Sequence, residues 1–291
     1  MSISRRGSGV GPAARALASQ VHPVFMLPPV ACSLFGAVLA GTFDVGLAES
    51  LDLSLAGLHA VAIFAAVYTA HVKDGYVDFH LRGEDDDHPL TERGCKAALA
   101  GSTALFFACV LALWAVAGFG PALLTLPTWL IGYHHAPQLD TNPVTATTGY
   151  PLGIALAILG GYYAQAGALG AVPVAFALVF LLVLSGVKVI DDAQDYDYDR
   201  SIEKRTVAVT VGPRRARTAA YALMAAGLAL VVGFAALAVF PPSSVAGVAG
   251  FGVVAVVARR ADPELATMLL VRGSYVFLAL LLAAVWFRPL G

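Results

Sequence analysis

Long apolar runs separated by short polar connections constrain this 291-residue chain more than any other feature of its sequence. An α-helix needs about 20 mostly apolar residues to cross the hydrocarbon core of a bilayer. Charged residues make up only 13% of the chain, whereas a typical soluble domain carries about 25%. The sequence therefore predicts an all-α, polytopic membrane protein, and no strand pattern or linker divides it into domains.

Hydropathy predicts a bundle of about nine transmembrane helices, of which the fourth and the last are short. We expect a flexible basic N-terminal segment over residues 1–20 and a single transmembrane domain over residues 21–291. The spans are expected near residues 22–42, 54–73, 96–117, 120–134, 148–166, 170–190, 216–239, 244–259 and 273–289.

The distribution of Lys and Arg predicts the orientation, because cytoplasmic connections of membrane proteins are enriched in both. With a cytoplasmic N-terminus, nearly all of the 18 basic residues lie on the cytoplasmic side, and Arg288 is the clear exception. We therefore expect an integral multi-pass protein of the cell membrane with its N-terminus in the cytoplasm. Because Arg272 would interrupt the ninth span, we expect a short surface helix over residues 261–272 before that span begins.

An acidic cluster, residues 188–206, follows the sixth apolar run and gathers five aspartates within nine positions. Asp192, Asp195 and Asp199 have i, i+3 and i+7 spacing, so on a helix they share one face. A row of carboxylates is a hard-oxygen site suited to Mg²⁺. With Lys188, Arg200 and Lys204 close in sequence, the pattern indicates a site for a phosphorylated ligand. A solvated loop is the simpler interpretation of such a charge run.

A second acidic cluster favours the functional interpretation. His71, Asp74 and Asp78 repeat the same spacing about 120 residues earlier, again at the end of an apolar run. Both clusters fall at the cytoplasmic ends of predicted spans, so they can face each other across one cavity. Two Mg²⁺ ions held between them could clamp a diphosphate, with Arg82 as a further basic contact.

These motifs resemble those of the UbiA-type intramembrane prenyltransferases. The second motif, Asp192-x-x-Asp195-x-x-x-Asp199-Arg200 followed by Lys204-Arg205-Thr206, is a close match. The first motif departs from the family pattern: Asp74 and Asp78 fit, but Ala70 replaces the usual Asn and His71 the first Asp. His88-Pro89-Leu90 resembles the family's downstream Arg-Pro-Leu, and Asp191 stands where Lys is common.

The resemblance implies Mg²⁺-dependent transfer of a prenyl group from an isoprenyl diphosphate to a lipophilic or aromatic acceptor within the membrane. It implies that Mg²⁺ is bound by Asp74, Asp78, Asp192, Asp195 and Asp199. Diphosphate contacts are expected from Lys188, Arg200, Lys204 and, less centrally, Arg82. His71 could be a metal ligand, a base or a structural residue. No nucleic-acid partner and no obligate protein partner is expected.

Two other functions remain open at the level of sequence. A membrane terpene cyclase would ionise the same diphosphate, but the cation would react with its own double bonds. A cation or phosphometabolite transporter would also place acidic residues in a membrane, although near the midplane and in broken helices. The acceptor, the donor chain length and the oligomeric state cannot be deduced from the sequence.

Several further residues carry weaker signals. The connection 134–147 contains His134 and His135, which as neighbours do not face one point on a helix and so favour a cavity mouth over a metal site. His22 at the start of the first span is similarly ambiguous between ligand contact and helix entry. The three cysteines, Cys32, Cys95 and Cys109, predict neither a disulfide framework nor a cysteine-based metal site.

Overall fold

The structure is a computed structural model that describes residues 2–43 and 51–289. Across these residues the chain is helical, and the one β-bridge joins Ser4 to Leu90. Within the described residues, nine long helices form the bundle: α2 (Pro23–Phe43), α3 (Leu53–Gly75), α4 (Glu92–Ala117), α5 (Phe119–Tyr133), α6 (Pro143–Ala166), α7 (Ala171–Gln194), α10 (Pro213–Ala236), α11 (Val245–Ala258) and α12 (Pro263–Phe287). The all-α bundle of about nine helices that the sequence predicts is therefore confirmed.

Seven helices within the described residues are long and apolar enough to cross a membrane. The other two long helices, α5 and α11, have 15 and 14 residues. A helix of that length spans only about 22 Å, so these two helices fall short of a full bilayer core. The fourth predicted span corresponds to α5 and is short, as expected.

The last span differs from its prediction. The expected surface helix over residues 261–272 is wrong, because α12 runs without a break from Pro263 to Phe287 and is 25 residues long. Arg272 lies inside this helix on its exposed side. A single Arg does not end a helix, since its long side chain can reach toward the polar interface while its backbone stays helical.

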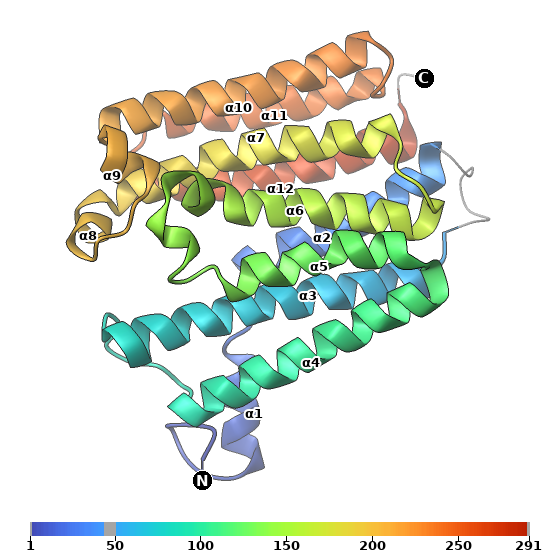
Figure 1. Ribbon diagram of the computed structural model, residues 1–291. Helices are drawn as coiled ribbons and strands as arrows, with labels where there is room; N and C mark the ends of the chain where they lie inside the picture. The colour runs from blue at the N-terminus through green and yellow to red at the C-terminus, as the bar shows by residue number, and fades with distance from the viewer. Residues whose placement is uncertain (1, 44–50, 290–291) are drawn as a thin grey trace.

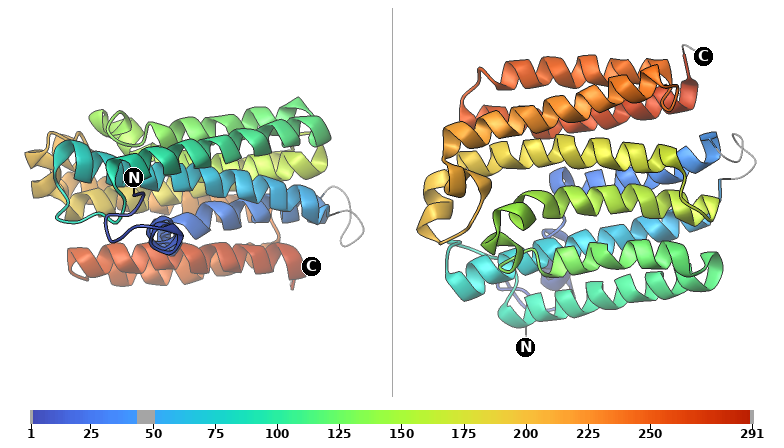
Figure 2. Two further views of the ribbon diagram at one scale, coloured as in Figure 1. Left: turned by 90° about the horizontal axis from the view of Figure 1, so that it is seen from below. Right: turned by 45° about the horizontal axis from the view of Figure 1, so that its top comes forward.

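Several short helices lie at one end of the bundle, together with the polar connections between them (Figure 1). They include the π-helix η1 (Tyr76–Arg82), which extends α3, the 3₁₀ turn η2 (Leu139–Thr141), α8 (Tyr196–Ser201) and α9 (Val207–Val211). Figure 2 shows from two further directions that the teal η1 region and the orange α8–α9 region stay at the same end, opposite the C-terminus. Both acidic clusters therefore lie at one end of the bundle.

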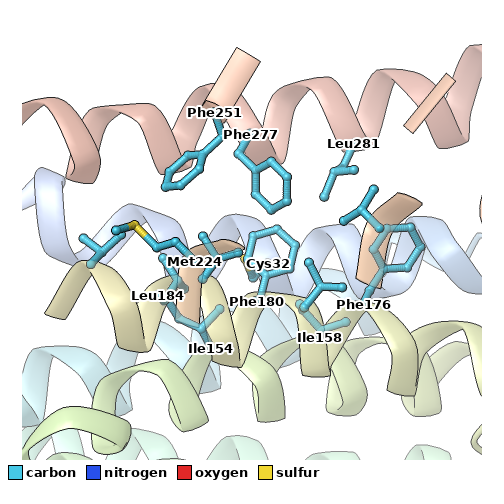
Figure 3. Close-up of a cluster of buried hydrophobic side chains, with 14 of the residues drawn as sticks. Cys32, Ile154, Ile158, Phe176, Phe180, Leu184, Met224, Phe251, Phe277 and Leu281 are labelled. Atoms are coloured by element: carbon cyan, nitrogen blue, oxygen red, sulfur yellow. The ribbon is translucent and has the colours of Figure 1, made fainter. Parts of the chain in front are cut away.

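A continuous apolar core fixes the central helices against one another. Phe176 and Phe180 of α7 pack on Phe35 of α2. Figure 3 shows Phe176 and Phe180 with Phe251 of α11 and Phe277 of α12, which complete the cluster. Each of these rings is almost fully buried. Because α7 contributes to this core along most of its length, the acidic motif at its end is attached to the most buried helix.

The N-terminal segment lies against the connection between η1 and α4. The backbone N–H of Arg5 donates to the carbonyl oxygen of Pro89 at 2.9 Å, and that of Thr91 donates to Ile3 at 2.9 Å. The short helix α1 (Val10–Ala18) follows and buries Ala16. The flexibility expected for residues 1–20 stays a prediction, and the observed contacts give this segment a defined place.

Candidate active site

The first acidic motif lies where α3 changes from an α-helix to the π-helix η1. Its residues His71 and Asp74 are on the last α-helical turns, whereas Asp78 is on η1. Arg82 lies one turn further, with its guanidinium 3.5 Å from a carboxylate oxygen of Asp78 and 3.6 Å from one of Glu84. Turns of π-helix are frequent at functional sites, because they redirect side chains without ending the helix.

The second acidic motif extends beyond the end of α7. Asp192 is on the last turn of α7, Asp195 has non-helical backbone angles, and Asp199 is on the separate helix α8. The expectation that Asp192, Asp195 and Asp199 share one face of a single helix is therefore wrong. The break at Asp195 separates the three carboxylates into a buried one on α7, an exposed one at the break and a buried one on α8.

Lys188 neutralises the acidic end of α7. Its ammonium donates to a carboxylate oxygen of Asp192 at 2.6 Å and to one of Asp191 at 3.0 Å. Asp192 is only 5% exposed, and its second oxygen, Oδ2, is buried without a hydrogen-bond partner among the described residues. A buried carboxylate oxygen without a partner is costly, so this atom is suited to accept a ligand.

Asp199 is held by the loop that follows it. The backbone N–H of Lys204 donates to the carbonyl oxygen of Asp199 at 3.0 Å, and the Lys204 ammonium lies 3.7 Å from its carboxylate. Burial raises the pKa of Asp199 to about 6, although Lys204 opposes this shift. Arg200, the next residue, is exposed. Asp199 can therefore take up or release a proton near neutral pH.

One hydrogen bond and one electrostatic interaction connect the regions of the two acidic motifs. The hydroxyl of Tyr198 on α8 donates to a carboxylate oxygen of Glu84, just beyond η1, at 2.6 Å. Lys204 interacts electrostatically with Asp78 of the first motif as well as with Asp199 of the second. The prediction that the two clusters face each other agrees with this geometry.

A cavity of about 350 Å³ opens between the central helices next to the motifs. Its polar lining comes from His71 and Asp74 of α3, Lys188 and Asp191 of α7, and His135. Its apolar lining extends further into the bundle and consists of Met26, Val67, Ile154, Leu184, Val187 and Val271, among others. The cavity is thus charged at one end and apolar along its walls.

Other polar groups at the cavity come from α2, α6 and α12. His22, just before α2, has its ring 5.7 Å from that of His71, and both line the cavity. Tyr150 donates to the carbonyl oxygen of Phe25 at 2.9 Å, and Tyr275 donates to that of Val24. These hydroxyls fasten α6 and α12 to the start of α2 beside the cavity.

Four acidic or hydroxyl residues belong to this region although the sequence did not single them out as site residues: Asp191, Glu84, Tyr198 and Asp140. Asp191 precedes the i, i+3, i+7 pattern and so fell outside it. Asp140 lies in a connection without Lys or Arg, and its carbonyl oxygen accepts from the backbone N–H of Arg205 at 2.9 Å. Burial raises the pKa of Asp140, against the opposing effects of His135 and Lys204. Glu84 and Asp140 are brought to the second motif only by the fold, through Tyr198 and Arg205.

The fold and the site together define a polytopic helical membrane protein with two aspartate-rich motifs beside one amphipathic cavity, which Asp74 of the first motif lines. The model of the UbiA prenyltransferase family matches residues 30–281, and the chain belongs to that family. No curated protein matches the sequence significantly.

Solved structures share the fold at low sequence identity. A digeranylgeranylglyceryl phosphate synthase is 14% identical with a TM-score of 0.68, covering 93% of this chain and 97% of its own. A UbiA homologue from Aeropyrum pernix K1 is 19% identical with a TM-score of 0.68, covering 92% and 98%. A UbiA homologue from Archaeoglobus fulgidus, bound to GPP and Mg²⁺, is 18% identical with a TM-score of 0.64, covering 91% and 99%.

Proposed function

We propose that this protein transfers a prenyl group from an isoprenyl diphosphate to a lipophilic or aromatic acceptor within the membrane, with Mg²⁺ as cofactor. The observation that supports this most strongly is the cavity, which is charged at one end and apolar along its walls. An isoprenyl diphosphate has the same division between an anionic head and a hydrocarbon tail. The Archaeoglobus fulgidus homologue has been solved with GPP and with DMAPP, each with Mg²⁺.

The acidic residues fit a Mg²⁺ site. The donors are carboxylates, which Mg²⁺ prefers, and the buried Oδ2 of Asp192 lacks any other partner among the described residues. We propose Asp74, Asp78, Asp192, Asp195 and Asp199 as the residues that would hold the ion. When bound there, Mg²⁺ would neutralise negative charge on the diphosphate as it leaves.

The chain's own residues have three roles in this proposal. Lys188 and Lys204 supply positive charge where the diphosphate gains negative charge, with Arg200 and Arg82 as further candidates. The apolar walls exclude water, which would otherwise trap the allylic cation. His71, beside Asp74, remains a candidate ligand or base, and His22 and His135 offer further polar contacts to an acceptor.

Diphosphate release tests the proposal directly. The purified protein in lipid vesicles is given geranyl, farnesyl or geranylgeranyl diphosphate with Mg²⁺, with and without an extract of host membrane lipids. We expect release that depends on the extract, together with products whose mass exceeds that of an extract lipid by one prenyl group. Release without extract would indicate cyclisation or hydrolysis, and no release with any donor would contradict prenyl transfer and favour transport.

The titration of Asp199 predicts a pH-dependent requirement for Mg²⁺. Because the pKa of Asp199 is raised to about 6, protons compete with the ion below that pH. We expect the Mg²⁺ concentration for half-maximal rate to rise by up to about tenfold per pH unit below pH 6. Without metal, the raised pKa of Asp199 has a second effect. As the pH falls from about 6 toward the usual Asp pKa, the folded protein takes up this proton before the unfolded chain does, and so gains stability. A wild-type Mg²⁺ requirement that is flat between about pH 7.5 and pH 5.5 would contradict this assignment.

We also propose that the motif-bearing end of the bundle faces the cytoplasm, which follows from the Lys and Arg distribution. The described cysteines Cys32, Cys95 and Cys109 are buried, so the wild-type background is low. In cells, Ser201→Cys on α8 should react with an impermeant maleimide only after the membrane is opened. Ala168→Cys, in the exposed connection after α6, should react from outside. The reverse pattern would place the site on the other side.

A further inference from the structure

A second group of potential metal ligands lies beside the first acidic motif and outside the lining of the central cavity. It consists of His80 on η1, His88 in the connection that follows, and Cys95 on the first turns of α4. Each residue offers one ligand atom, and these atoms lie within 4.8 Å of one another. The spacing of the three residues along the chain predicts no metal site, so only the fold brings them together.

The ligand atoms lie somewhat further apart than around a bound ion, and a small movement of the side chains would bring them around one. Cys95 Sγ lies 3.9 Å from His88 Nδ1, and ligand atoms around a tetrahedral zinc ion lie about 3.4–3.6 Å apart. The carbonyl oxygen of Leu90 is 3.2 Å from His80 Nε2 and 3.3 Å from His88 Nδ1. This oxygen, or a water molecule, can complete a fourth position.

One tautomer of the histidine at the centre of the cluster leaves a nitrogen able to bind a metal. With its proton on Nε2, His88 can accept at Nδ1 from the backbone N–H of Leu90 at 3.2 Å, and the same Nδ1 lies 3.9 Å from Cys95 Sγ. Because Nδ1 has a single lone pair, a bound metal ion would replace this hydrogen bond. An imidazole binds a metal through such an unprotonated nitrogen.

The cluster is enclosed. Cys95 is fully buried and His88 is 5% exposed, and Nε2 of His88 has no hydrogen-bond partner among the described residues. Phe79 stacks on His88 with ring centroids 5.8 Å apart, and the Arg5 guanidinium covers Phe79 at 4.3 Å. The N-terminal segment thus closes the site, as expected for a structural metal and not for a catalytic one.

We propose that His80, His88 and Cys95 form a structural zinc site, separate from the carboxylate site proposed for Mg²⁺. Two imidazole nitrogens and a thiolate are borderline-soft donors that favour Zn²⁺, whereas Mg²⁺ prefers oxygen. On binding, a zinc–sulfur bond replaces the S–H bond of Cys95, and the proton leaves to solvent. No electron transfer is involved, and the proposal does not depend on the prenyl-transfer function.

The ion would hold together three consecutive segments of the chain. It would link η1, the connection that carries Glu84, and the start of α4. Glu84 accepts the hydrogen bond from Tyr198 of the second motif. A zinc ion at this position therefore stabilises the segment by which the two acidic motifs contact each other.

Cobalt substitution tests the site, because Co²⁺ bound to a thiolate absorbs in the near ultraviolet. The full chain, purified in detergent and stripped of metal, should bind one equivalent of Co²⁺ with this charge-transfer band. Zn²⁺ should abolish the band and Mg²⁺ should not. Cys95→Ser should lose the band, whereas Cys109→Ser, a buried cysteine further along the same helix, should keep it.

Thermal unfolding of the wild type provides a second readout that needs no variant to fold. Zn²⁺ in excess over its Kd should raise Tm by at least about 3 °C relative to a chelator, and His88→Ala should lose this increase. A wild type with neither the band nor the Tm shift would overturn the proposal and leave Cys95 as a hydrogen-bond donor to His88. A band that persists in Cys95→Ser would also overturn it, because the thiolate would then come from elsewhere.

Discussion

Asp192→Asn should reduce prenyl transfer by at least about a hundredfold, the scale of loss when one preorganised electrostatic group is removed from an active site. Asp192, at 5% exposure, is one of the two buried carboxylates of the second motif, and its Oδ2 has no partner within the described residues. The amide keeps the size of the side chain but loses the charge that Mg²⁺ requires. Excess Mg²⁺ should therefore not restore the rate, which is measured as diphosphate released per enzyme.

Asp197→Asn is the matched control for this prediction. Asp197 lies five residues further in the same acidic run but is exposed, so its loss should change the rate by less than about twofold. Lys188 also pairs with Asp191 at 3.0 Å, so its ammonium should keep a partner in Asp192→Asn. If the folded Asp192→Asn protein retains a near wild-type rate, the proposed metal site is wrong.

Gly161→Val should prevent folding or destabilise the protein by about 3 kcal/mol or more, the upper range for overpacking. At Gly161 on α6, a Cβ atom would overlap the backbone carbonyl of Ser33 on α2. In the same way, a Cβ atom at Gly36 on α2 would overlap the backbone carbonyl of Ile158 on α6. Because backbone atoms cannot rotate away, the two helices would have to move apart. Small residues at helix contacts in membranes normally allow such a close approach.

Gly153→Ala on the same helix provides the comparison. A Cβ at Gly153 meets no atom within 4 Å, and Ala is a better helix former than Gly by about 1 kcal/mol. This variant should unfold at or slightly above the wild-type temperature in a detergent thermal-stability assay. Equal stability of Gly161→Val and Gly153→Ala would show that α2 and α6 do not approach as closely as described.

The helices were largely predictable because the hydrophobic pattern is local. A span from residue 22 to 42 corresponds to α2 at Pro23–Phe43, and a span from 244 to 259 corresponds to α11 at Val245–Ala258. The prediction failed at Arg272, where a charge was given more weight than helix continuity. A charged side chain on the exposed face costs little, because it leaves every backbone hydrogen bond of α12 intact.

The site was predictable only in outline. Spacing along the chain identified His71, Asp74 and the aspartates of the second motif, and the structure brings their two segments to one end of the bundle. The prediction from spacing assumed a continuous helix through Asp195, but the helix ends just before this residue. Asp140 and Glu84 have no pattern of their own, since their partners come from α8 and the segment before α9.

The sequence by itself determined the all-α membrane class, the approximate spans and the presence of two acidic motifs, because each depends on residues near one another in the chain. Only the tertiary structure decided which carboxylates are buried, that Tyr198 donates to Glu84, and that His80, His88 and Cys95 meet. Burial and partner choice depend on which helices pack together. That packing is set by contacts such as Gly36 against Ile158, between residues more than a hundred positions apart.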